Sequence, residues 1–389
     1  MLRSRRPETD TFDLSCAASC CANSFSHSAE TMAITPIRVE PHEPVAPARS
    51  FVFDLLRAAA ICSILLAHSG PPAFVAQLRN FDVVLVVLIG GAVCALANER
   101  RPIEPVAYMK KRALRLLAPT YVFLAGYFVL MEIVAPARFD AEIMLRTFLL
   151  ADGIGYVWIL RIFLIVALLA PWLLRLRDRV SPRAYFALLF CAYVADEAVY
   201  AMFERLPVTR ASEWVEFTLF YAVPYGAIFG LGLRWPRMSQ TEAARWAVAA
   251  FAVWLAMLAV IDSLHASVRT WDYKYPPRAI YVWYGLAAGH AVYAMFLGAD
   301  LGRGRAARVV EFVSAQSLWI YLWHIPSLQV GRELAQRLDL PAPWVTKWLV
   351  TTSLSLSLTW TQTRLVAWYR RTRQPTGMKR WFLDNVLQC

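Results

Sequence analysis

The stretch FVFDLLRAAAICSILLAHSG, residues 51–70, decides the fold. It is apolar and long enough to predict a membrane-spanning helix, yet it carries Asp54, Arg57 and His68. Eleven residues of helix return Arg57 and His68 to nearly the same face, about 16 Å apart along the axis. Asp54 can pair with Arg57 on that face. Because ionisable groups in lipid are costly, the stripe predicts an intramembrane site. A surface Asp–Arg anchor with a histidine near the far surface is the alternative.

The whole chain has the composition of a membrane protein. Its 389 residues are 58% hydrophobic and 17% charged, with a mean hydropathy of +0.43. The expected fold is an all-α polytopic integral membrane bundle of about ten transmembrane helices. A shorter apolar segment, 143–151, is expected at the membrane interface. The ten predicted spans are 51–69, 81–98, 114–135, 156–174, 184–203, 215–233, 244–262, 279–298, 312–330 and 346–368.

Basic residues predict the orientation of these spans. The two tails and the even-numbered gaps carry about 25 Lys and Arg, against about 11 in the opposite gaps. The positive-inside rule therefore predicts a multi-pass protein of the cell (inner) membrane with both termini cytoplasmic. The same rule explains the net charge of +12 without a polyanion. No zinc-finger, RRM-like or phosphate-loop pattern occurs, so nucleic acid is not an expected partner and no metal site is expected.

Three parts of the chain differ in composition. Residues 1–48 lack an apolar run and are rich in Ser, Ala, Pro and charged residues, which predicts a disordered cytoplasmic tail. A normal lead-in to the first span begins at Met32, so an over-extended gene start is one hypothesis for the preceding residues. The transmembrane domain is expected over 49–370, followed by a second cytoplasmic tail over 371–389.

A second ionisable cluster stands at the predicted cytoplasmic entry of the third span, in KKRALRLLAPTY, residues 110–121. Arg112 and Arg115 are three residues apart and share one helical face. Arginine forks match phosphate oxygens, so the pair predicts a docking site for a phosphate-bearing ligand. Basic residues also belong at an inner membrane surface, and a purely topological role is the alternative.

Further charges lie toward the predicted outer side. Arg161, in the outer half of the fourth span, needs a partner, and Asp196 and Glu197 on the fifth span lie at a similar depth. They predict either a buried ion pair between the two spans or a polar acceptor channel. The gap before the eighth span, DYKYPPRAIYVWYG, sets Lys274 and Arg278 among tyrosines. Such groups suit sugar rings and anionic glycans, although Tyr also belongs at membrane interfaces.

Four motifs follow one another in a recognisable order. They are D-x-x-R-x10-H from Asp54, R-x-x-R-x-x-x-P-x-Y from Arg112, W-x-L from Trp158, and SLWIYLWHIP from Ser317, with Tyr321, His324 and Pro326. In this order the chain resembles the acyltransferase-3 family over residues 51–370. Members of this family are integral-membrane enzymes that move acyl groups, mostly acetyl, onto sugars of surface polysaccharides, lipids and other glycans. Gly90–Gly91 departs from the Ser-Gly usual in the family.

The resemblance implies an O-acyltransferase that modifies polysaccharides or related acceptors. It would use a cytosolic acyl-CoA, with acetyl-CoA expected, and would bind no resident cofactor. The acceptor hydroxyl, on a glycan, a glycolipid or another lipid-linked molecule, would approach from the outer face. Membrane lipids are the remaining expected partner. A multi-pass transporter or exporter without acyl-transfer chemistry and a non-catalytic scaffold are the alternatives, although no internal repeat favours a transporter.

The resemblance and the residue chemistry together suggest roles for the site residues. His68 titrates near neutrality and is the expected general base. Arg57 would position the donor or polarise its carbonyl, and Asp54 would hold Arg57. Arg112 and Arg115 would bind the donor phosphates. The residues expected to support the site or to line an acceptor channel are Arg161, Asp196, Glu197, Tyr321 and His324.

Overall fold

The computed structural model describes residues 51–99, 103–136, 138–297, 304–339 and 343–387. These described residues all fall within one compact unit. The predicted tail 1–48 and the alternative start at Met32 lie outside the described residues. The division into a transmembrane domain and two tails stays a prediction.

Every regular element of the described chain is helical, which confirms the all-α class. Two short turns of helix, η1 (Trp235–Arg237) and η2 (Thr270–Tyr273), join longer helices, and a third, η3 (Leu383–Leu387), follows the last α-helix. The α-helices are α1 (Phe51–Ala67), α2 (Ala73–Leu78), α3 (Asp82–Ala97), α4 (Pro105–Val134), α5 (Ala141–Phe148), α6 (Trp158–Arg179), α7 (Pro182–Phe203), α8 (Arg210–Gly232), α9 (Gln240–Ser263), α10 (Ala279–Phe296), α11 (Arg305–Ala315), α12 (Ser317–Arg337), α13 (Trp344–Arg373) and α14 (Gly377–Phe382).

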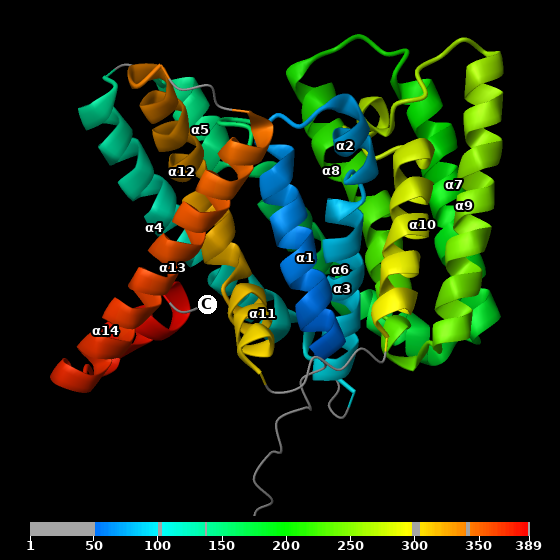
Figure 1. Cartoon of the computed structure of the whole chain (residues 1–389). Helices are drawn as coiled ribbons and strands as arrows, with labels where there is room; N and C mark the ends of the chain where they lie inside the picture. The colour runs from blue at the N-terminus through cyan, green and yellow to red at the C-terminus, as the bar shows by residue number, and fades with distance from the viewer. Residues whose placement is uncertain (1–50, 100–102, 137, 298–303, 340–342, 388–389) are drawn as a thin grey trace, which may run out of the picture. The chain divides into compact units, whose positions relative to one another are not determined.

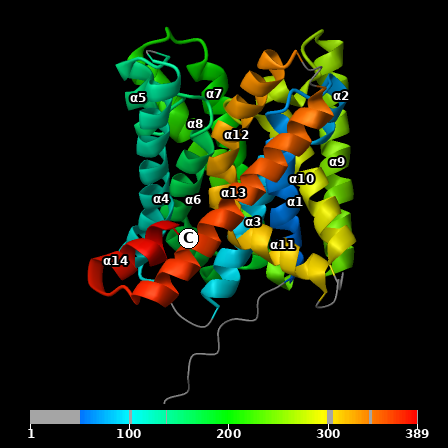
Figure 2. The same ribbon diagram turned by 60° about the vertical axis from the view of Figure 1, so that its left-hand side comes forward.

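Seven helical segments of the described residues are long and apolar enough to cross a membrane. They comprise α2 with α3, and then α4, α6, α7, α8, α9 and α10. The fold is therefore a polytopic membrane helical bundle, whereas the count of about ten stays a prediction. Of the other three predicted spans, α1 has only 17 residues, and α12 and α13 are long but more polar. α1 packs against α3 and α10, α12 packs against α4, and α13 packs against α12 and α1 (Figures 1 and 2).

Polar side chains fix the starts of several helices. An N-cap oxygen accepts a backbone N–H of the first turn and satisfies a group that the helix leaves unpaired. At α9, Ser239 and Glu242 form a reciprocal capping box. The N-cap residues with such a bond are Asp140 of α5, Ser181 of α7, Thr209 of α8 and Ser239 of α9.

The predicted ninth span, 312–330, is not one helix. The structure interrupts it at Gln316, so that α11 ends at Ala315 and α12 begins at Ser317. The sequence SAQS around the break is polar, and Ser side chains compete with the backbone for hydrogen bonds. Ser314 Oγ in fact bonds away from its helix, to Asp54 on α1. The prediction was wrong here because apolar content alone does not reveal a break.

Two glycines bring α3 and α8 into close contact. A Cβ added to Gly91 would lie 2.2 Å from the carbonyl oxygen of Phe229, and one added to Gly232 would lie 2.1 Å from that of Leu88. No side chain fits in either place, so the backbones themselves meet. At Gly90, in contrast, an added Cβ would only touch the Phe229 ring at 3.7 Å.

The connections alternate between two edges of the bundle. Figure 1 shows the start of α11 and the α14 segment at the lower edge, where α1 begins, and α2 and α5 at the upper edge, where α1 ends. The gaps predicted to share one side of the membrane thus lie at one edge. α1 packs against α3, α11, α12 and α13, so its two ends face different neighbours.

Candidate active site

A cavity of about 360 Å³ lies beside the first half of α1. Arg57 of α1 lines it together with Arg112 and Arg115 of α4. The remaining walls come from α3, α6, α8 and the α11–α12 break, where Ser314 and Ser317 face the space. The structure therefore brings Arg57 together with Arg112 and Arg115, which lie more than 50 residues further along the chain, and all three were predicted to act on the donor.

The α4 side of this cavity carries two exposed arginines one helical turn apart. The Arg112 guanidinium carbon lies 5.4 Å from the centre of the Tyr108 ring. The Tyr108 hydroxyl in turn lies 3.2 Å from Cys94 Sγ on α3. This contact ties α4 to α3 next to the cavity. Two guanidinium forks with exposed donors are suited to an anionic ligand, phosphate above all.

Asp54 is buried one turn before Arg57, with 6% of its surface exposed. Its Oδ1 accepts a hydrogen bond of 2.5 Å from Ser314 Oγ. The carboxylate thus connects α1 to the end of α11, a link that sequence reasoning missed because Ser314 belongs to none of the motifs. That Asp54 holds Arg57 in place stays a prediction.

His68 lies just beyond the other end of α1. The helix ends at Ala67, two residues earlier than predicted, and the His68 N–H bonds to the Leu65 carbonyl in a final turn at 3.2 Å. The imidazole packs edge-on against the Tyr156 ring, with 4.9 Å between centroids. The His324 ring lies 5.0 Å away on another side.

Hydrogen bonds orient the rings around His68. The Tyr321 hydroxyl donates to the Tyr156 carbonyl, which ties α12 to the segment before α6. His324 Nδ1 contacts the Tyr321 carbonyl, and since a carbonyl only accepts, Nδ1 carries the proton. In neutral His324, Nε2 is then the acceptor, and it is buried with no partner among the described residues. Tyr321 and His324 thus lie in one cluster with His68, and their predicted role in supporting the site stays a prediction. Tyr156, which the sequence analysis did not single out, completes the cluster.

A family model described as an acyltransferase domain matches residues 52–364, most of the chain. The chain belongs to the acyltransferase-3 family. The match covers both ends of α1, the α4 arginines and the α12 cluster. It identifies the protein as a multi-pass membrane acyltransferase. Comparison with curated proteins and with solved structures gives no match.

The predicted ion pair between Arg161 and the fifth-span carboxylates is absent from the described part of the acyltransferase. Asp196 and Glu197 instead bind Arg278, with N–O distances of 3.5 and 2.5 Å. Arg278 stands in the connection before α10 and reaches back onto α7. Arg161 turns to α8, where its guanidinium carbon lies 4.7 Å from the centre of the Phe217 ring. Equal depth in two spans did not make their side chains neighbours, because the two helices present different faces.

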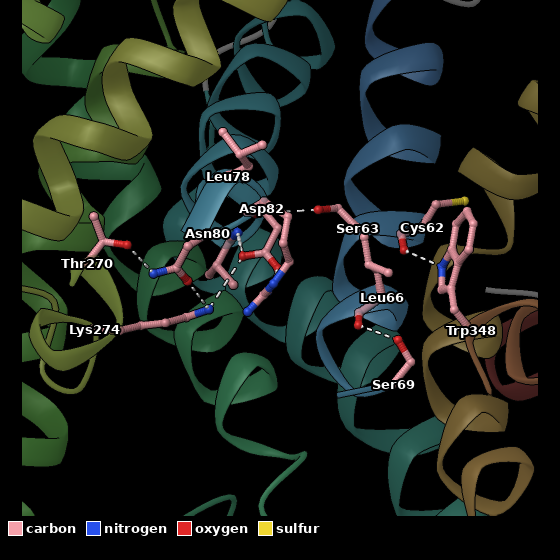
Figure 3. Close-up of polar contacts among 12 residues, drawn as sticks. Cys62, Ser63, Leu66, Ser69, Leu78, Asn80, Asp82, Thr270, Lys274 and Trp348 are labelled. Atoms are coloured by element: carbon pink, nitrogen blue, oxygen red, sulfur yellow. Dashed lines mark hydrogen bonds and ion pairs between the residues drawn. The ribbon is translucent and has the colours of Figure 1, made fainter. Parts of the chain in front are cut away.

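A second polar network of the acyltransferase joins the α2–α3 turn to the loop before α10 (Figure 3). Lys274 Nζ donates to Asn80 Oδ1 at 3.1 Å and lies 3.5 Å from Asp82 Oδ1. Asn80 Nδ2 donates to Thr270 Oγ1 at 2.8 Å. Arg79 Nη1 lies 2.5 Å from Asp82 Oδ2, so one carboxylate serves two cations. These contacts clamp the loop onto the end of α3.

Lys274 is therefore not exposed at the outer face for sugar binding, as the sequence suggested. Only 2% of its surface is accessible, and its Nζ lies 5.1 Å from the centre of the Trp271 ring. Burial lowers the pKa of Lys274 to about 8, against the opposing effect of Asp82. The clamp could have been suspected from Asp82, a lone carboxylate at the start of an otherwise apolar span.

Proposed function

We propose that this acyltransferase moves an acyl group, acetyl in the first instance, from cytosolic acyl-CoA to a hydroxyl group of a glycan, glycolipid or similar acceptor at the outer face of the cell membrane. One observation carries the proposal. The three-arginine cavity lies at one end of α1, and the His68–His324 pair lies at the other. An anion site and a base joined by one helix suit a donor and an acceptor that arrive from opposite sides.

The cavity end is suited to the donor. Arg112 and Arg115 are exposed and would hold the phosphates of coenzyme A. Arg57, deeper along α1, would contact the arm that carries the thioester. A volume of about 360 Å³ lies within the range of small-molecule sites. Because about 16 Å of helix separates Arg57 from His68, an extended donor arm has to span the distance between the two ends.

The ring cluster is suited to the chemical step. His68 would take the proton of the acceptor hydroxyl as its oxygen attacks the thioester carbonyl. A new C–O bond forms, the C–S bond breaks, and the imidazolium returns the proton to the departing thiolate. His324 Nε2 offers an acceptor beside His68 that can hold the imidazole in one orientation. Acyl transfer by this route leaves an ester and free coenzyme A, with no covalent enzyme intermediate.

The orientation that we propose sets Arg112 and Arg115 at the cytoplasmic side and both termini in the cytoplasm. It is supported by the excess of basic residues in the gaps that lie at one edge of the bundle (Figure 1). Reporter fusions after Arg177 should report the cytoplasm, and fusions within residues 262–278 should report the outer side. The reverse pattern would overturn the scheme.

Turnover of acyl-CoA by the purified protein tests the function itself. We expect release of the coenzyme A thiol from acetyl-CoA, accelerated by hydroxyl acceptors and lost in His68→Gln. Mass analysis of surface glycans and lipids, with and without the gene, should then show an acetyl group that depends on the protein. A protein without thioester cleavage, whose loss changes no surface molecule, would instead be a transporter or a scaffold.

A further inference from the structure

Arg161 differs from the other deeply buried cations of the described chain. Arg79, Arg177 and Lys274 each have a carboxylate within 4.0 Å. Arg161 is 8% exposed, yet it makes no hydrogen bond or ion pair with any described residue. Its Nε and Nη1 are both enclosed and unpartnered. A buried guanidinium without a counter-charge is strongly destabilising, so its presence calls for an explanation.

Aromatic rings hold the Arg161 side chain in place. Its guanidinium carbon lies 4.7 Å from the centre of the Phe217 ring and 5.2 Å from that of Tyr221, both on α8. Cation–π contacts position the charge but leave the N–H donors in the guanidinium plane unused. Nε and a terminal nitrogen form the two-pronged edge that matches a carboxylate or phosphate.

The carboxylates that could have neutralised Arg161 are committed elsewhere. Asp196 and Glu197 bind Arg278, and Asp152 binds Arg146 through two hydrogen bonds of 2.6 and 3.0 Å. The counter-ion of Arg161 is therefore not supplied by these neighbours.

The position of Arg161 connects it to the acceptor end of the proposed reaction. It lies on the first turns of α6, close after Tyr156, which packs on His68. Trp158, one turn earlier, contacts the Tyr275 ring at 4.9 Å in the clamped loop. The Arg161 fork and the proposed base are thus held by the same end of one helix, on the side opposite to the three-arginine cavity.

We propose that Arg161 binds an anionic group, a carboxylate or phosphate, of the acceptor, which makes the acceptor an acidic molecule. That the bound molecule is the acceptor rests on the proposed function. That Arg161 binds an anion does not. The competing role is a purely structural cation–π anchor. The two roles differ in what happens when the charge is removed. An anchor stabilises the fold, whereas an unpaired binding group costs stability until its ligand arrives.

The test is thermal unfolding of the full-length protein in neutral phosphatidylcholine nanodiscs. The probes are glucuronate and glycerol phosphate, with glucose and glycerol as neutral matches at equal ionic strength. We expect the anions alone to raise the Tm, and Arg161→Gln to weaken their apparent affinity about 10- to 150-fold. Without ligand, Arg161→Met should unfold at the same temperature as the wild type or higher. Arg138→Gln removes an exposed charge that has no ion pair among the described residues and should respond like the wild type.

Three results would overturn the proposal: no response to either anion, a response that Arg161→Gln retains, or a lower Tm for ligand-free Arg161→Met. A fourth arm replaces part of the phosphatidylcholine by phosphatidylglycerol. If that lipid alone produces the Arg161-dependent shift, the site holds a lipid headgroup and the acceptor proposal is wrong. Stabilisation by acetyl-CoA is measured in parallel. If acetyl-CoA does not stabilise the protein, that result counts against the proposed function and leaves the conclusion on the anion site unchanged.

Discussion

At its first half α1 presents Arg57 to a cavity of about 360 Å³, whereas beyond its last residue His68 is enclosed by the rings of Tyr156 and His324. At the cavity end, Arg112 and Arg115 are exposed and a ligand can provide their counter-charge. At the ring end, the Tyr321 carbonyl orients the His324 imidazole, and the Tyr156 and His324 rings pack against that of His68. The contrast teaches that this acyltransferase keeps space for a ligand at one end of the helix and fixed geometry at the other.

Substitutions at the two ends of α1 should therefore change different kinetic constants. Loss of a ring-end residue removes an interaction made in the transition state and should lower kcat. Loss of a cavity-end arginine removes donor binding and should raise KM. The following experiments test this division, beginning with the largest expected effect.

His68→Gln should lower kcat by about 10²- to 10⁴-fold, the range for loss of a general base, with little change in the KM for acyl-CoA. Steady-state release of coenzyme A measures both constants, and an unchanged Tm shows that the fold survives. His324→Gln is the companion variant, because His324 presents its Nε2 acceptor in the same cluster. Near-normal kcat in His68→Gln would remove His68 from the mechanism.

Arg57→Lys should be nearly as damaging as Arg57→Ala, since a point charge does not replace a planar fork. Because Arg57 contacts the donor arm about 16 Å of helix away from His68, each variant should raise the KM for acyl-CoA, by about 10- to 150-fold for loss of one charged hydrogen bond. The comparison of the two variants in one assay is the measurement. Full activity in Arg57→Lys would reduce Arg57 to an anchor.

Arg112→Ala and Arg115→Ala should raise the KM for acyl-CoA while leaving the KM for the acceptor unchanged. Loss of one charged hydrogen bond costs about 1.5–3 kcal/mol, or about 10- to 150-fold in donor binding. Lys110→Ala, an exposed neighbour that does not line the cavity, is the control. An unchanged donor KM in correctly inserted variants would return both arginines to a topological role.

Substitution of Lys274 should have the smallest effect of the series. It should change the stability of the fold, and the change should depend on pH. Because the folded-state pKa of about 8 lies below the unfolded value of about 10.4, the folded protein releases the proton first. Stability linked to Lys274 therefore rises between these two values, by up to about 1.4 kcal/mol per pH unit. The Tm of the wild type minus that of Lys274→Met should be flat below about pH 8 and increase above it. A flat difference throughout would show that burial does not depress this pKa.

The amino-acid sequence by itself determined the all-α membrane class, the approximate bounds of the long helices and the family. Apolar runs of spanning length can only be helices in lipid. The spacing of residues in a motif can be read from the sequence without any knowledge of contacts. The sequence also singled out Arg57, Arg112, Arg115 and His68, because ionisable groups are conspicuous in apolar surroundings.

Only the tertiary structure decided which of these residues meet. The three arginines share one cavity, and His324 and Tyr321 reach His68, because α4 and α12 pack near different ends of α1. The carboxylates expected to pair with Arg161 bind Arg278 instead, and Lys274 is buried beside Asp82. Periodicity places a side chain on one face of its own helix. Which neighbour that face meets depends on how the helices are rotated and packed, and no single stretch of sequence encodes that.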